Sequence, residues 1–82
     1  MRLPISGRMY RVVFIPLRDV DGDHEPGQIR IDSRLKGRRR LNTIIHEVLH
    51  ACGLVSERDT SRFAGAIARM LWKLGYRSNN SR

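Results

Sequence analysis

The sequence has little of what usually stabilises or anchors a small protein. Cys52 is the single cysteine among 82 residues, so an intramolecular disulfide is excluded and a reducing compartment fits the composition. No apolar run approaches the length of a membrane span, and the N-terminus lacks the apolar segment of a signal peptide. We therefore expect a soluble cytoplasmic protein without a membrane partner, in which Cys52 is a small buried apolar residue.

Acidic and aromatic residues are also scarce. Eight aspartates and glutamates stand against 16 lysines and arginines, giving a net charge of +8, which favours acidic partners such as nucleic acid. Arg38, Arg39 and Arg40 lie at the start of a predicted helix, where positive charge opposes the helix dipole, so they are candidates for contacts with phosphate. The few aromatic residues are not interleaved with arginines, which argues against base stacking. A solvated charged surface is the alternative interpretation of this cluster.

The length of the chain leaves room for a single domain, residues 1–82, in which residues 1–8 and 76–82 are candidates for flexible ends. A chain of this size buries only about 60–65% of its unfolded surface, so its core must be thin. Metal binding would therefore matter for folding as well as for chemistry.

The predicted order of elements is strands followed by helices. A strand is expected over Met9–Leu17, a polar loop over residues 18–27, and a short half-buried strand over Gln28–Asp32. Helices are expected from about Arg39 to Cys52 and from Ser56 to Gly75. These elements predict an α+β fold, in which a small two- or three-stranded antiparallel sheet is followed by two packed helices.

Each predicted helix has an apolar face. In the first helix this stripe consists of Leu41, Ile45, Val48, Leu49 and Cys52. In the second helix the face expected to pack on the first consists of Phe63, Ile67, Met70, Leu71 and Leu74. Ser56 and Asp59 have the spacing of a capping box, and Gly53 and Gly75 are natural C-terminal stops.

The segment from His46 to His50 reads His-Glu-Val-Leu-His, which has the spacing of a zinc-binding helix. Residues at i and i+4 project from one helix face, so both imidazoles can reach one ion. Glu47 lies about 100° round the helix from His46, beside such an ion and not on it. From there it could take a proton from a water whose pKa zinc has lowered. Two ordinary histidines on an amphipathic helix are the alternative.

A catalytic zinc site usually has three protein ligands, so the histidine pair needs a partner. Glu57 is the first candidate, because the short connection after the first helix can bring the first turn of the second helix back over the histidines. Asp59 is the alternative, because its helical phase places it nearer the face expected to pack. His24 as a ligand, or no third protein ligand, remains open.

These motifs resemble a known family of metallopeptidases. The segment Leu41–Ala51, followed by Ser56-Glu57 and the helix containing Phe63-Ala64, is similar to small zincin-like metallopeptidases of bacteriophage type. Those proteins look like minimal relatives of the SprT-like and ImmA/IrrE-like families. The resemblance covers roughly residues 28–75.

The resemblance implies a zinc-dependent peptidase that acts on a protein or peptide substrate, in the host cytoplasm if a phage encodes it. It implies that His46, His50 and Glu57 hold Zn²⁺ and that Glu47 is the general base. It also implies that the strand before the motif helix, here Gln28–Asp32, pairs with the substrate backbone. The alternative function is a basic module that binds nucleic acid or protein, with zinc in a structural role only.

Overall fold

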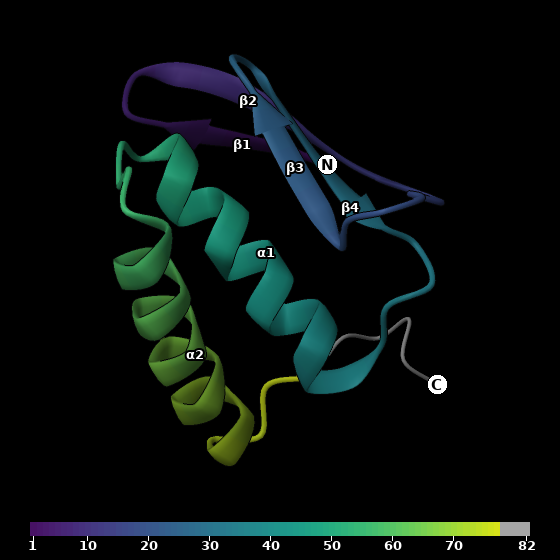
Figure 1. Cartoon of the computed structure of the whole chain (residues 1–82), viewed down its shortest axis with the longest axis vertical. Coiled ribbons are helices and arrows are strands. Elements are labelled where there is room, and N and C mark those ends of the chain that lie inside the picture. The colour runs from purple at the N-terminus through teal and green to yellow at the C-terminus, as the bar shows by residue number, and fades with distance from the viewer. Residues whose placement is uncertain (78–82) are drawn as a thin grey trace.

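The structure is a computed structural model that describes residues 1–77. Four strands are followed by two helices (Figure 1): β1 (Arg2–Ile5), β2 (Arg8–Ile15), β3 (Gly22–Glu25), β4 (Gln28–Asp32), α1 (Gly37–Ala51) and α2 (Glu57–Lys73). This order confirms the predicted α+β class. Within the described residues, neither helix is long and apolar enough to cross a membrane.

The sheet differs from the expected one in strand number and direction. Its order is β1-β2-β4-β3, and β2 runs parallel to β4 while the other neighbours are antiparallel. β1 occupies part of the 1–8 segment that was a candidate for a flexible end. β3 lies within the segment predicted to be a polar loop. Neither the number of strands nor the purely antiparallel pairing was therefore predicted correctly.

The core lies between one face of the sheet and α1. Tyr10 and Val12 of β2 and Ile29 and Ile31 of β4 alternate with more exposed residues, as expected for strands with one covered face. These residues form one buried cluster, on which three residues of α1 pack. The α1 residues in contact with the cluster are Ile44, Val48 and Ala51. The sheet thus holds one side of α1 firmly.

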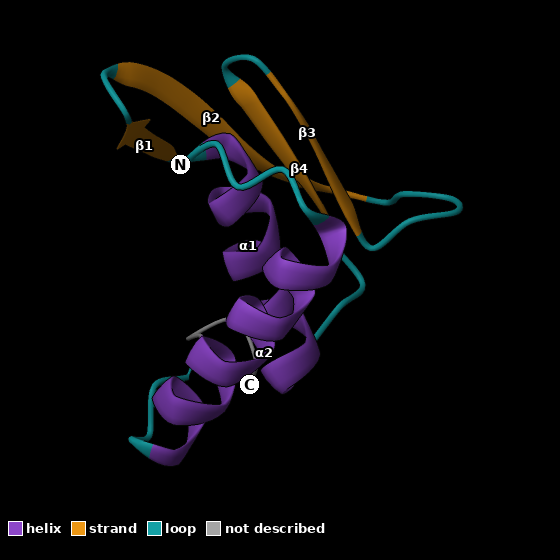
Figure 2. Ribbon diagram, turned by 60° about the vertical axis from the view of Figure 1, so that its left-hand side comes forward, coloured by secondary structure: helices purple, strands orange, loops and turns teal. Residues whose placement is uncertain are grey.

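α2 packs along α1 on the side away from the sheet, so α1 is the middle layer (Figures 1 and 2). The fully buried residues of α2 are small: Thr60, Ala64 and Ala68. Phe63, Met70 and Leu74, which were expected to form the packing face, are instead 40%, 56% and 67% exposed. Small side chains let the two helix backbones approach closely, and the larger apolar residues lie beside the contact.

The helix ends follow the sequence signals closely. The Oγ of Ser56 accepts a hydrogen bond from the Asp59 backbone N–H at 3.1 Å, as the capping prediction required. Gly53 and Gly75 follow the two helices with φ angles of 105° and 94°, a conformation that favours glycine. Cys52 is exposed at the end of α1, so the prediction that it is buried was wrong.

The C-terminal segment is described only in part. Of the predicted flexible end 76–82, Tyr76 is exposed and the guanidinium of Arg77 lies 3.4 Å from the centre of the Trp72 ring. The rest of that prediction, residues 78–82, falls outside the described residues.

Candidate metal centre

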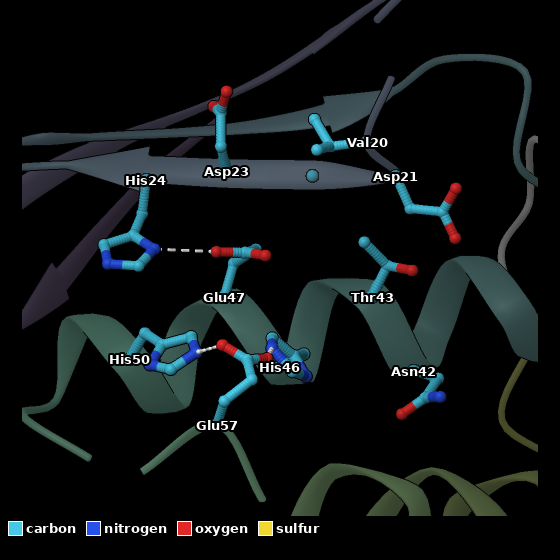
Figure 3. Close-up of a pocket in the computed structure, with 11 residues that line it drawn as sticks. Val20, Asp21, Asp23, His24, Asn42, Thr43, His46, Glu47, His50 and Glu57 are labelled. Atoms are coloured by element: carbon cyan, nitrogen blue, oxygen red, sulfur yellow. Dashed lines mark hydrogen bonds and ion pairs between the residues drawn. The ribbon is translucent and has the colours of Figure 1, made fainter. Parts of the chain in front are cut away.

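α1 places the three motif residues along one cleft. The cleft has a volume of about 490 Å³ and is bounded by β3, by α1 and by the first turn of α2. His46, Glu47 and His50 line it from α1, as the helical spacing predicted (Figure 3). Glu47 is buried, and both histidines are partly buried. The sheet packing of α1 therefore fixes the helix face that carries the motif.

Glu57 reaches both histidines from the start of α2. Its Oε1 lies 2.5 Å from His46 Nε2, and its Oε2 lies 3.0 Å from His50 Nε2. One ligand atom from each of the three residues lies within 4.8 Å of the others, a grouping that could hold a metal ion. The predicted first-choice set of ligands thus comes together at one end of the cleft.

The two ring nitrogens of His50 both face hydrogen-bond acceptors. Nδ1 lies 2.7 Å from the carbonyl oxygen of Leu54, and Nε2 faces the Glu57 carboxylate. A neutral imidazole has one N–H, and neither a carbonyl nor a carboxylate can donate. Either His50 is cationic, or its Nδ1–H donates to Leu54 and a cation lies between Nε2 and Glu57. The second arrangement is the one that a zinc ligand with an outer partner adopts, so these residues fit a metal.

The charge state of Glu57 is consistent with a ligand role. Burial raises the pKa of Glu57, but hydrogen bonds from His46 and His50, and the charge that these rings carry when protonated, lower it by more. The net effect holds the pKa of Glu57 below its ordinary value. The side chain therefore remains a carboxylate, the form that binds cations.

Glu47 makes a contact that the motif alone does not specify. The Nδ1 of His24, on β3, lies 2.8 Å from Glu47 Oε1. The His24 ring also stacks on that of His50, with ring centres 5.0 Å apart and an interplanar angle of 19°. His24 was open as a third ligand, but the three-residue metal-binding group does not include it. The structure instead places it against the predicted general base.

β3 approaches α1 closely because residue 22 is glycine. A Cβ atom at Gly22 would lie 2.9 Å from Thr43 Cγ2 and 3.2 Å from Glu47 Cγ. The strand that lines the cleft is therefore β3, at the edge of the sheet, whereas β4 is an inner strand between β2 and β3. The expectation that Gln28–Asp32 pairs with substrate was wrong, since both edges of β4 are already hydrogen-bonded.

Asp59, the alternative ligand, points elsewhere. Its carboxylate lies 3.5 Å from the guanidinium of Arg62, one turn further along α2. It is not part of the group that could hold a metal. α2 packs on α1 through its small residues and not through the large apolar face that was expected. With the helix turned in this way, Glu57 lies over the histidines and Asp59 does not.

The three arginines predicted to contact phosphate have different surroundings. Arg39 makes two hydrogen bonds of 2.9 Å with Asp21. Arg40 is partly buried, with its guanidinium 4.3 Å from the centre of the Phe14 ring. Arg38 is exposed. Two members of the cluster thus make contacts within the chain, Arg39 through an exposed ion pair and Arg40 with an aromatic ring.

Most of this centre follows from the motif, but His24 does not. No spacing rule links a histidine in a polar segment to a glutamate 23 residues later, and that segment contains no apolar alternation. The signal that could have found it is Pro26-Gly27 directly before the strand 28–32, since this pair is typical of a turn between two strands. In comparisons with protein-family models, with curated proteins and with solved structures, the chain gives no significant match.

Proposed function

We propose that this chain is a zinc-dependent metallopeptidase that hydrolyses peptide bonds in a protein or peptide substrate. The observation that carries the proposal is the environment of His50, whose two ring nitrogens face two acceptors, at 2.7 and 3.0 Å. His50 and Glu57 would together hold zinc, and the imidazole could then stay neutral, with its Nδ1–H donating to Leu54. The resemblance of the motif residues to zincin-like peptidases supports the same function.

The donor set suits catalysis better than a purely structural site. His46, His50 and Glu57 offer two nitrogens and one carboxylate, which leaves one position of a tetrahedral site for water or substrate. Zinc bound there supplies Lewis acidity, which lowers the pKa of water and polarises a carbonyl group. The site adjoins a cleft of about 490 Å³, so an extended substrate can approach it.

Glu47 performs the proton transfers in this proposal. Its carboxylate lies beside the three ligands without belonging to them, and it is 7% exposed. It takes the proton of the attacking water and later delivers that proton to the leaving amine. The peptide itself can pair with the outer edge of β3, with which no other strand pairs among residues 1–77.

The single cysteine and the arginine cluster bear on where the protein acts and on what else it could bind. The single cysteine favours a reducing environment, so we place the activity in the cytoplasm, of the host cell if a phage encodes the chain. The proposal rests on the histidine and glutamate group and not on the arginine cluster, in which Arg39 and Arg40 already contact Asp21 and Phe14.

The test is to compare the native chain with Glu47→Gln on an unstructured protein substrate. The variant keeps the shape of the side chain and all three ligands, so we expect native zinc content and thermal stability. Its rate of hydrolysis should fall by about 100- to 10,000-fold, the usual contribution of a general base. His46→Ala is the matched control and should lose zinc and activity together. Equal hydrolysis by the native and Gln chains at equal zinc content would contradict the proposal.

A further inference from the structure

We propose that His24 is a positioning residue for Glu47 and that it selects Oε2 of Glu47 as the atom that accepts the proton. The inference rests on the proposed hydrolysis. His24 Nδ1 lies 2.8 Å from Glu47 Oε1, and a carboxylate can only accept, so the imidazole N–H donates to this oxygen. Accepting this bond makes Oε1 the less basic of the two oxygens, so Oε2 takes the proton.

The register of the sheet directs His24 toward the site. His24 is paired with Ile29 across β3 and β4, and opposite residues in a ladder point to the same face. Ile29 is fully buried beneath α1, so His24 also projects toward α1. The next residue back on β3, Asp23, projects to the other face and pairs there with Arg30. Because successive side chains of β3 point to opposite faces, the strand directs His24 into the cleft and Asp23 away from α1.

The His24 ring is held on more than one side. It stacks on the ring of His50 at 5.0 Å, so the histidine of β3 and a candidate metal ligand support each other. Close approach at Gly22, two residues earlier, keeps β3 against the Glu47 side chain. A glutamate has three rotatable bonds, and ordering them costs free energy that a fixed donor offsets. His24 therefore defines one orientation for the base before substrate arrives.

β3 would position both the general base and the substrate: His24 holds Glu47, and the strand edge is open to a peptide. His24 is 39% exposed in its side chain, and it belongs to the edge strand that offers its backbone to a peptide. A peptide paired with β3 would therefore lie at a defined distance from the residue that orients Glu47. Placement of this kind raises the rate of the chemical step more than it raises affinity, because reacting groups are already aligned.

The experiment compares His24→Asn with His24→Leu in the full chain loaded with zinc. The amide nitrogen of asparagine can take the place of Nδ1, since both are bonded to Cγ, whereas leucine has no donor. We expect His24→Leu to lower kcat by about 10- to 100-fold with KM changed less than about threefold, and His24→Asn to keep kcat within about fivefold of native. Zinc affinity should fall by less than about tenfold in both variants, because the His24 ring only stacks on His50 and lies outside the group of candidate ligands.

Other outcomes overturn the proposal. Equal losses of kcat in both variants would mean that the imidazole acts on substrate directly, and unchanged kcat in His24→Leu would mean that Glu47 needs no support. A fall of more than about tenfold in zinc affinity in both variants would make His24 part of the metal site.

A crystal structure of the zinc-loaded native chain separates this inference from the proposed function. If the native chain hydrolyses nothing, the proposed function fails, yet the His24 Nδ1–Glu47 Oε1 bond can still be observed. Its presence supports the positioning contact. A Glu47 carboxylate turned away from His24 in that structure overturns it.

Discussion

His50 has a hydrogen-bond acceptor at each ring nitrogen, and this one imidazole links three parts of the chain. Its Nδ1 faces the carbonyl of Leu54 in the connection after α1, and its Nε2 faces Glu57 at the start of α2. His46 approaches the other oxygen of Glu57. The two acceptors at His50 cannot both be satisfied by the single N–H of a neutral imidazole. Zinc held by His50 and Glu57 would remove this conflict.

Asp32 gives the clearest pH-dependent contribution to stability. Hydrogen bonds from the side chain and backbone of Arg34 lower the pKa of Asp32 from 3.8 to about 2. Because the pKa is lower in the folded chain, this contribution is complete above about pH 4 and is lost as the pH falls toward about 2. The Arg34 guanidinium also donates to the Leu17 carbonyl, so the pair joins the end of β4 to the segment after β2.

We expect Asp32→Asn to lower the free energy of unfolding at neutral pH. The same substitution should flatten the fall in that free energy between about pH 4 and about pH 2, because the titrating group is gone. Urea unfolding of both chains across this range measures the difference. Parallel curves for the native and Asn chains would show that Asp32 contributes nothing through its charge.

The three candidate metal ligands were the part of the site that the sequence predicted best. The i and i+4 spacing of His46 and His50 is set by helix geometry alone, and Glu57 follows from the short connection between helices. The contact between His24 and Glu47 depends on tertiary pairing of a strand, which local patterns do not contain. The exposure of Cys52 depends on where α1 ends, at Ala51, one residue earlier than the apolar stripe suggested.

At the scale of elements, β3 shows why sequence patterns missed a functional strand. Its residues, Gly22 to Glu25, include no apolar side chain, because the strand lies at the sheet edge beside the cleft. Hydrophobic alternation detects strands that cover a core, such as β4, and gives no signal here. The inner strand β4 was therefore predicted correctly, whereas the edge strand β3 was wrongly predicted to be a loop.

Replacing Gly22 with alanine tests whether β3 must lie this close to α1. We expect Gly22→Ala to destabilise the chain by about 1–3 kcal/mol, because the new Cβ would lie 2.9 Å from Thr43 Cγ2 and 3.0 Å from the Arg30 carbonyl oxygen. Hydrolysis should fall too, since the strand that holds His24 must move. Thermal unfolding and kinetics measure the two effects.

Gly65→Ala is the matched control within α2. A Cβ at Gly65 meets no atom within 4 Å, so alanine should raise stability by about 0.5–1 kcal/mol through its better helix propensity. If Gly22→Ala proves as stable and active as the native chain, the tight contact between β3 and α1 is not required.

For α2, the sequence predicted the helix and its N-terminal cap better than the face that packs on α1. Its helical extent and its cap at Ser56 were predicted, because local hydrogen bonding decides them. The packing face was predicted only in part. Ile67 and Leu71 are partly buried, whereas Phe63 and Met70 are exposed and the small residues Ala64 and Ala68 are fully buried instead. Small residues permit the closest approach of two helices, and only the folded partner shows which stripe is used.

At the scale of the whole molecule, the candidate metal centre lies where α2 and the sheet edge approach α1 from different sides. The buried cluster lies between the sheet and α1, and α2 packs chiefly on α1. Candidate ligands from both helices lie close together, and His24 of β3 contacts Glu47 beside them. Zinc bound there should therefore stabilise the folded chain as a unit. At free zinc of about 100 times Kd, linkage predicts about 2.7 kcal/mol.

The zinc content of the purified chain tests the central claim most directly. We expect one zinc ion per native chain at neutral pH, and a rise in melting temperature when zinc is restored after chelation. Glu57→Ala should weaken zinc binding by more than about 100-fold, since loss of even an outer partner typically costs about 10- to 100-fold. Asp59→Ala, its matched control, should bind zinc as the native chain does. A native chain that contains no zinc, and whose melting temperature added zinc leaves unchanged, would contradict the account.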